Sequence, residues 1–381
     1  MTIVNTQEEF IASRNARIVE LETQCKQFTE EVDQQIAHKN SIIASKDTSL
    51  QKKEATNQSL NDQLTKTRDY LTNKPQSLQV QLSYSQCSEA PVKMSTGLAI
   101  TINGKIYYGG GDCDDDNKYY VYCYDPPQDV WSTLPKLPVR YFGLGQVKRE
   151  LVAVGGRDLS GPTSNVVYVF NKGKSWKRTI PPMPTARDSL TVVSLPTHLV
   201  VAGGRLVSHS SVYTDNVEIY NISTSQWSET DRLPYACLDQ RGIVCNNTVY
   251  IMGGSDGNRL NKVCAAQIDK LITADRQDDG NANKADSVWN IIPNTPSYRP
   301  SAVTISGTLF AVGRLDSERE VTQKVYAYSS SMNSWLYVGD LPSPVTFAAT
   351  VSLSPTECLV IGGWNATERQ STVHKITAAI F

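Results

Sequence analysis

The chain has 381 residues, of which 37 are Lys or Arg and 38 are Asp or Glu, so its formal net charge is −1. This balance argues against a bulk nucleic-acid binder, which carries a basic excess, and no stretch approaches the roughly 18 apolar residues of a membrane span. The first residues lack the basic-then-apolar order of a secretory signal, and the 8 cysteines are too sparse for a disulfide framework. We therefore expect a cytoplasmic protein with reduced thiols.

Glycine and proline divide the sequence into two parts. All 23 glycines and all 18 prolines lie after residue 74, so residues 1–74 contain no helix breaker. Apolar residues recur there every seven positions, in two series, the second of which begins at Ile36 and is offset by four residues. This pattern predicts a coiled coil with a stutter. A helix with so narrow an apolar stripe is unstable alone in water, so we expect homo-oligomerisation through residues 1–74. The alternative is a single frayed amphipathic helix.

The rest of the chain repeats one pattern six times. A short apolar run ends in a glycine pair, and a polar loop and an alternating segment follow. That segment ends in an aromatic residue, and in most copies a tryptophan comes six or seven positions later, as in Tyr124 and Trp131. Four short strands per copy predict one blade of a β-propeller. The pairs are Gly110-Gly111, Gly155-Gly156, Gly203-Gly204, Gly253-Gly254, Gly313-Arg314 (where arginine replaces the second glycine) and Gly362-Gly363.

The sixth copy lacks a tryptophan strand of its own. Tyr84 precedes Pro91 by the spacing that separates Trp131 from Pro138. We therefore expect residues 78–91 to supply the outer strand of blade six, which closes the ring and removes an exposed sheet edge. The alternative is that this segment is only a linker.

The double glycine followed by a separated Tyr and Trp, in six copies, resembles the kelch-repeat family. The resemblance implies an all-β fold, a six-bladed kelch β-propeller over residues 75–381, here preceded by the long α-helical coiled-coil segment. It also implies a non-enzymatic scaffold for protein–protein interaction. The fourth copy contains a polar insertion at about residues 270–286, which we expect to be a loop between its third and fourth strands.

Basic residues recur at two positions of the repeat, directly after the glycine pair and just ahead of the innermost strand. Strand directions alternate, so both positions lie on one face, around the channel mouth. In kelch propellers that face commonly binds a short peptide, so the resemblance implies a partner with an acidic or phosphorylated motif. The alternative is structural, with the arginines paired to neighbours such as Asp188. The arginines expected at the mouth are Arg140, Arg157, Arg187, Arg205, Arg241, Arg299 and Arg314.

We do not expect an enzyme, a metal site or a cofactor. Histidines such as His198 and His374 do not converge, and no phosphate-binding glycine loop or GxSxG motif is present. The acidic run that begins at Asp112 is interpreted as a solvated loop rather than a calcium site. Two alternatives implied by the resemblance remain: a substrate-recognition subunit of a ubiquitin ligase and a cytoskeletal (actin) binding protein. The domains that such ligase subunits carry ahead of their propeller do not fit into residues 1–74.

Overall fold

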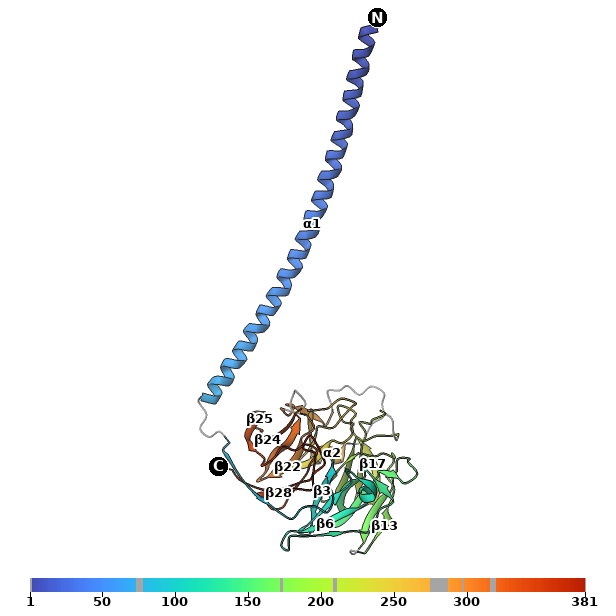
Figure 1. Ribbon diagram of the computed structural model, residues 1–381, viewed down its shortest axis with the longest axis vertical. Coiled ribbons are helices and arrows are strands. Elements are labelled where there is room, and N and C mark those ends of the chain that lie inside the picture. Colours follow the sequence, from blue (N-terminus) through green and yellow to red (C-terminus); the bar gives the residue numbers. More distant parts are fainter. Residues whose placement is uncertain are drawn as a thin grey trace. The chain divides into compact units, whose positions relative to one another are not determined.

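The computed structural model describes residues 2–72, 78–171, 174–207, 211–274, 287–296, 298–315 and 320–380. The chain divides into two compact units, Met1–Ser77 and Leu78–Phe381, and Figure 1 shows a helix in the first and a propeller in the second. Of the helices in the described ranges, none combines the length and the apolar content of a membrane span.

The first unit is the single helix α1 (Thr2–Thr72). Its unbroken length follows from the absence of Pro and Gly, the two residues that interrupt helices most strongly. Apolar side chains along it are exposed, with Leu21 at 46% and Phe28 at 68%. A lone helix therefore leaves its apolar stripe in water. The predicted helical segment is confirmed, whereas its pairing with a second copy stays a prediction.

The second unit is built from antiparallel sheets around a central axis (Figure 1). Within the described residues the strands form six four-stranded sheets, one for each repeat, and two short two-stranded sheets; the six confirm the predicted six-bladed propeller. Blades one to three consist of β3 (Leu98–Ile102), β4 (Lys105–Gly109), β6 (Val121–Asp125) and β7 (Val130–Thr133); β9 (Gly143–Val147), β10 (Glu150–Val154), β12 (Val167–Asn171) and β13 (Ser175–Ile180); and β14 (Thr191–Ser194), β15 (His198–Ala202), β16 (Val217–Asn221) and β17 (Gln226–Thr230).

Blades four and five follow the same plan, and blade six takes its fourth strand from the start of the unit. Their strands are β18 (Arg241–Cys245), β19 (Thr248–Met252), β20 (Val263–Gln267) and β21 (Asn290–Ile292); β22 (Ser301–Ile305), β23 (Thr308–Leu315), β24 (Val321–Ser329) and β25 (Ser334–Asp340); and β26 (Ala349–Ser352), β27 (Glu357–Ile361), β28 (Val373–Ile380) and β1 (Val80–Gln86). The innermost strands contact one another in the closed order β3, β9, β14, β18, β22, β26 and back to β3.

The ring is closed by β1, which lies within the 78–91 segment. It pairs antiparallel with β28 along its whole length, from Val80 opposite Ile380 to Gln86 opposite His374. In Figure 1 the two strands lie together although their colours come from opposite parts of the bar. This pairing covers the edge that β28 otherwise exposes.

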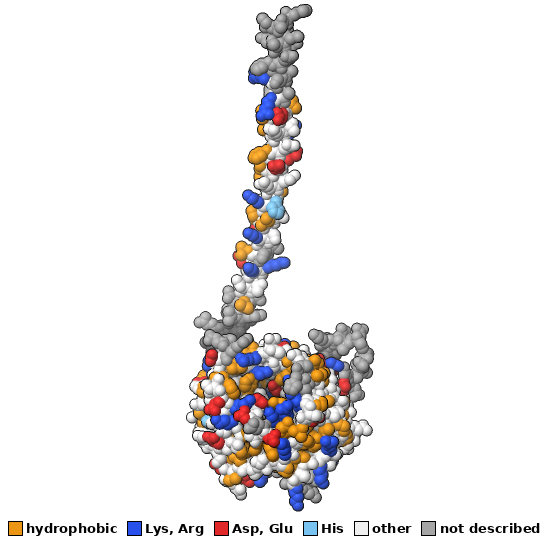
Figure 2. Space-filling model, turned by 45° about the vertical axis from the view of Figure 1, so that its right-hand side comes forward, with side chains coloured by type: hydrophobic (Ala, Val, Ile, Leu, Met, Phe, Trp, Pro, Cys, Tyr) orange, Lys and Arg blue, Asp and Glu red, His pale blue; other side chains and the backbone are white. Residues whose placement is uncertain are grey.

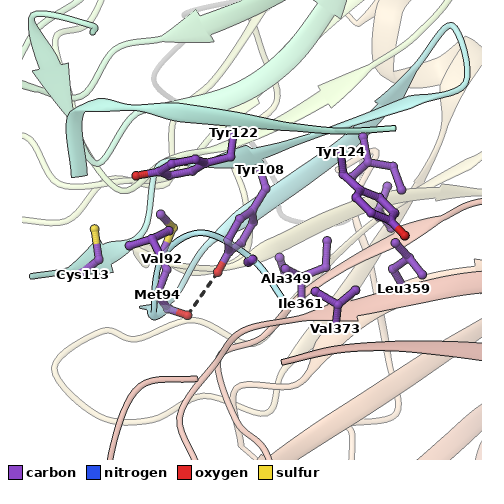
Figure 3. Close-up of a cluster of buried hydrophobic side chains, with 13 residues drawn as sticks. Val92, Met94, Tyr108, Cys113, Tyr122, Tyr124, Ala349, Leu359, Ile361 and Val373 are labelled. Atoms are coloured by element: carbon purple, nitrogen blue, oxygen red, sulfur yellow. Dashed lines mark hydrogen bonds between the residues drawn. The ribbon is translucent and has the colours of Figure 1, made fainter. Parts of the chain in front are cut away.

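Apolar side chains fill the wedges between neighbouring blades. Figure 3 shows Tyr108 and Tyr124 of blade one beside Ala349, Leu359 and Val373 of blade six, all buried. The phenol of Tyr108 donates to the backbone carbonyl of Met94 at 3.3 Å. Aromatic rings bury a large apolar area in one contact, which is why the repeat places them where two blades meet.

In each of blades one to five, one tryptophan forms a hydrogen bond to the preceding blade. Each lies on or beside the outer strand of its blade, and its indole N–H donates to a backbone carbonyl just after the outer strand of the preceding blade. These bonds satisfy the polar end of the ring while its apolar body is packed. They run from Trp131 to Ser88, Trp176 to Pro135, Trp227 to Pro181, Trp289 to Asp231 and Trp335 to Pro293, at 2.8–3.1 Å.

The insertion in blade four is not a loop throughout. Its first residues belong to the helix α2 (Ile268–Thr273), and Leu271 is fully buried there beside Trp289. The expectation of an unpacked loop from about residue 270 was therefore wrong for this part, because one apolar side chain in a polar sequence reaches the core. Residues 275–286 of the insertion lie outside the described residues.

Candidate functional site

A turn with left-handed backbone stands just ahead of every innermost strand. At this position φ is between 51° and 56° in all six blades. Residues other than glycine seldom adopt such angles, so their recurrence shows that the turn between blades imposes them. We call these residues the mouth ring: Thr96, Tyr141, Ser189, Asp239, Arg299 and Phe347.

The mouth ring surrounds a cavity. All six of its residues line a space of about 400 Å³, together with Ser95, Asp112, Arg205, Leu238, Trp364 and Arg369. Backbone hydrogen bonds join neighbouring members: the N–H of Ser189 donates to Tyr141 at 2.9 Å, and the N–H of Asp239 donates to Ser189 at 3.0 Å. Ring side chains are therefore held at the channel mouth by a fixed backbone. Figure 2 shows basic, acidic and apolar side chains mixed on one face of the propeller.

The residue before each mouth-ring position pairs with the residue after the glycine pair of the same blade, and this pairing extends the ladder between the first and second strands toward the mouth. Asp188 pairs with Arg205 in this way, and Arg140 with Arg157. A Cβ on Gly204 would lie 2.8 Å from the carbonyl oxygen of Asp188. The glycine pair is thus required for this close approach.

The predicted arginines that precede the innermost strands do not occupy equivalent positions. In this register Arg187 lies one residue before the paired position, Arg140 at it, and Arg299 one residue after it. Arg241 comes two residues after the mouth-ring position and begins β18. In the sequence these arginines lie at similar distances from the innermost strand, but the turns that precede the strands differ in length. The arginines therefore do not form one ring.

Arg157 and Arg187 are buried, and neither lines the cavity. Arg157 is 3% exposed and donates to the carboxylate of Asp188 at 2.9 and 3.1 Å. Arg187 has no exposed surface and forms an ion pair with Glu218 at 3.0 Å. The expectation that these two arginines face the mouth was wrong, because internal carboxylates hold them.

Arg205 and Arg299 do line the cavity. Arg205 donates to Asp188 at 2.9 and 3.1 Å, on the opposite carboxylate oxygen from Arg157. Arg299 donates to the carbonyl of Gly254 at 3.3 Å, and its guanidinium stacks on the ring of Phe347 at 5.1 Å. Within the described residues Arg299 forms no ion pair with a carboxylate.

Two further predicted arginines lie close to the mouth without lining it. Arg241 forms no ion pair within the described residues, and burial lowers its pKa, against the opposing effect of Asp239. Arg140 stacks on the ring of Tyr141 at 5.4 Å. Arg314 lies in β23, in the second-glycine slot, and its side chain is outside the described part of the chain.

Two charged residues at the mouth were missed by the sequence reasoning. Arg369 pairs with Asp112, and with Asp114 at 2.8 Å, so the acidic run of blade one is partly neutralised. Asp239 belongs to the mouth ring, and burial raises its pKa while Arg299, Arg241 and Arg205 oppose that rise. One signal was available. Asp239 follows Pro234 by five positions, and Thr96, Ser189 and Phe347 follow prolines by the same spacing.

The arrangement suits binding of an anionic group beside an apolar one. Arg205, Arg299, Phe347 and Trp364 line the same cavity, and the guanidinium of Arg299 stacks on Phe347. The histidines stay apart, in β15 and β28 among other places, and the described residues contain no group of three or more His, Cys, Asp or Glu side chains that could hold a metal ion. All 8 cysteines are free thiols.

Comparison with known proteins supports the fold. The Kelch motif family model matches residues 98–138 and 186–233. The chain is 24% identical to Kelch-like protein 40 of Xenopus tropicalis over 65% of this chain and 39% of that protein. It is 22% identical to Kelch repeat and BTB domain-containing protein 2 of cowpox virus (strain Brighton Red), over 58% and 40%. It thus spans about two fifths of the length of these relatives.

A solved structure has the same architecture. The structure of YjhT superimposes with a TM-score of 0.62 at 16% identity, over 78% of this chain and 100% of that one. At this level of identity the likeness concerns the fold alone.

Proposed function

Because this chain belongs to the kelch-repeat β-propeller family, generally an interaction fold without catalytic activity, we propose that it is a non-enzymatic scaffold whose channel mouth binds a short protein segment with an acidic side chain. Interaction with other proteins is what its kelch-like relatives suggest. The observation that carries the acidic ligand is the pair Arg241 and Arg299. Within the described residues neither forms an ion pair, and both lie in or next to the concave mouth.

The energetics favour such a ligand. A hydrogen bond to an ionised group contributes about 1.5–3 kcal/mol when it forms in a partly desolvated place. Arg299 is held in place by Gly254 and Phe347, so it loses little side-chain freedom on binding. Two such bonds and one buried apolar side chain correspond to micromolar affinity after the cost of association.

The exposed apolar stripe of α1 supports a second part of the proposal, homo-oligomerisation through residues 1–74. Two or more propellers on one coil would engage a target at several points and gain about 10²–10⁴ in apparent affinity where the geometry permits. Light scattering on the full chain and on a chain beginning at Pro75 tests this part. We expect the first to be oligomeric and the second monomeric, and equal masses would contradict it.

A second candidate function is that of a substrate-recognition subunit of a ubiquitin ligase. It is favoured by the similarity to kelch-like proteins, one of which is named as containing a BTB domain. It uses the same mouth for substrate. The two candidates differ in whether the chain copurifies with a cullin, which only the second requires.

Panning of a random peptide display library on the full chain tests the acidic ligand. We expect the selected pool to be enriched in Asp or Glu, and the enrichment to vanish on a chain with Arg241→Ala and Arg299→Ala. The matched control is Arg178→Ala, because Arg178 also stacks on an aromatic ring, that of Tyr168 at 5.3 Å, but does not line the mouth. A wild-type pool without acidic residues contradicts the proposal.

A further inference from the structure

The chain contains 6 tryptophans, and Trp364 differs from the other five. Those five donate their indole N–H groups to the preceding blade, as Trp227 does to Pro181 at 2.9 Å. Trp364 instead follows the glycine pair of blade six and lines the cavity at the mouth. Its indole N–H has no hydrogen-bond partner among the residues that the structure describes. A tryptophan that neither joins two blades nor satisfies its N–H lacks the structural role of the other five.

Trp364 also differs from the residues at the same position of the other repeats. The equivalent residue in each other blade is the one that pairs with the residue before the mouth-ring position, and it is polar or charged in four blades and aliphatic in one. Blade six alone presents an aromatic face there. The equivalent residues are Asp112, Arg157, Arg205, Ser255 and Leu315.

The backbone holds Trp364 next to the mouth ring. The backbone N–H of Trp364 donates to the carbonyl of Thr346 at 2.7 Å, and the backbone N–H of Thr346 donates to the carbonyl of Trp364 at 2.9 Å. Thr346 is fully buried and directly precedes Phe347. Arg299 stacks on Phe347, so blades five and six place a guanidinium and an indole on the same cavity.

We propose that Trp364 is the apolar anchor of the bound segment, with its indole face packed on an apolar side chain of the ligand and its N–H donating to a ligand oxygen. The inference rests on the proposed function and adds a second requirement to it: the segment carries an apolar residue within about two positions of its acidic residue. The acidic group lies toward Arg299, and the apolar one lies toward blade six. Tryptophan is among the residues that dominate binding energy at protein interfaces.

Three variants distinguish the apolar contact of the indole face from the hydrogen bond of the indole N–H. Trp364→Ala removes the apolar face and the donor, whereas Trp364→Phe removes the donor and keeps a face. Trp227→Phe is the matched control, since it makes the same change at a tryptophan between blades. Denaturant unfolding of each chain shows whether it is folded, and Trp364→Phe keeps the test valid if the alanine variant is not.

The experiment is peptide panning on these full-length chains, followed by titration of the strongest wild-type peptide with tryptophan fluorescence as the readout. We expect the wild-type pool to combine an acidic residue with Leu, Ile, Phe, Tyr or Trp nearby. With Trp364→Ala the acidic enrichment persists, the apolar enrichment is lost and affinity falls at least tenfold. Trp364→Phe keeps the apolar enrichment, loses a few-fold in affinity and abolishes the fluorescence change, while Trp227→Phe retains both affinity and fluorescence change.

Different outcomes separate the two proposals. A wild-type pool that is acidic but has no apolar preference overturns the role of Trp364 and leaves the acidic ligand standing. A fluorescence change that persists in Trp364→Phe overturns it as well. A pool without acidic residues overturns the proposed function, and the inference with it.

Discussion

Arg187 and Glu218 form an ion pair at 3.0 Å in which neither side chain is accessible to solvent. The guanidinium also donates to the backbone carbonyls of Asn216 and Val201, both at 3.2 Å. Burial lowers the pKa of Arg187 and raises that of Glu218, and each partner opposes the shift of the other. These contacts hold the segment ahead of β14 to β15 and β16, and burial keeps the guanidinium out of reach of a ligand.

Breaking this pair should destabilise the propeller without a specific effect on binding. Arg187→Met leaves the carboxylate of Glu218 buried without a counter-charge, which costs about 3–5 kcal/mol. The double variant Arg187→Met with Glu218→Leu should lose less, because no charge stays buried. Guanidinium chloride unfolding measures both, and a loss below about 1 kcal/mol for the single variant would show that the charge is solvated.

Closure of the ring by β1 predicts the effect of truncation. A chain that begins at Met94 lacks β1, so it loses the contacts of Val80, Leu82 and Tyr84 with the wedge between blades five and six and exposes the edge of β28. We expect it to unfold at lower temperature and less cooperatively than a chain that begins at Pro75. Calorimetry distinguishes the two, and equal transitions would contradict a structural role for β1.

The fold could be predicted because each repeat carries the same sequence pattern at a similar spacing. The pattern consists of a glycine pair, an apolar run and a paired Tyr and Trp. Each of these features has the same structural role in the blades where it occurs. Tyr124 and Trp131, for example, lie with ring centroids 4.9 Å apart, and Trp131 binds the end of blade six. Six copies of a weak pattern are strong evidence, since one accidental match does not recur at the same spacing.

The site could be predicted only in part, because turns between blades differ in length and charge pairing depends on register. Arg299 and Arg140 look equivalent in the sequence, but only Arg299 belongs to the mouth ring. Asp188 was foreseen as a partner for the arginines, yet the sequence could not show that it binds Arg157 and Arg205 at once. Asp239 reaches the mouth through a left-handed backbone conformation. No residue type other than glycine marks such a conformation in a sequence, so residue type alone did not place Asp239 there.

The helix in the blade-four insertion predicts one sensitive position. Leu271 is fully buried and packs with Trp289, and its carbonyl accepts a hydrogen bond from Thr230 at 3.1 Å. Leu271→Ala should cost about 2–5 kcal/mol, whereas the neighbouring exposed change Lys270→Ala should stay within about 0.5 kcal/mol. Denaturant unfolding gives both numbers. Equal small losses would mean that α2 does not contribute to the core.

The raised pKa of Asp239 predicts how binding depends on pH. Its carboxylate faces Arg205, Arg241 and Arg299, with Asp188 adding negative charge. A ligand carboxylate seated on those arginines raises the pKa of Asp239 further, so a proton is taken up on binding and affinity should rise as pH falls from 8 toward the pKa of Asp239. A ligand glutamate, with a pKa of about 4.3, stays ionised in this range.

Titration of a selected peptide at several pH values, on the wild type and on Asp239→Asn, checks this dependence. The asparagine variant should bind more tightly at pH 8 and show a flat profile. A profile that is equally steep in both chains would assign the proton to another group.

The central claim is that guanidinium groups at the mouth bind an acidic segment. Its most direct test is the dissociation constant of one selected acidic peptide, measured at low and high salt on the full chain, on a chain with Arg205, Arg241 and Arg299 all changed to alanine, and on Arg178→Ala. We predict at least a tenfold loss for the triple variant, no change for the control, and a wild-type affinity that weakens as salt rises. Unchanged affinity of the triple variant, in a chain that remains folded, would contradict the account.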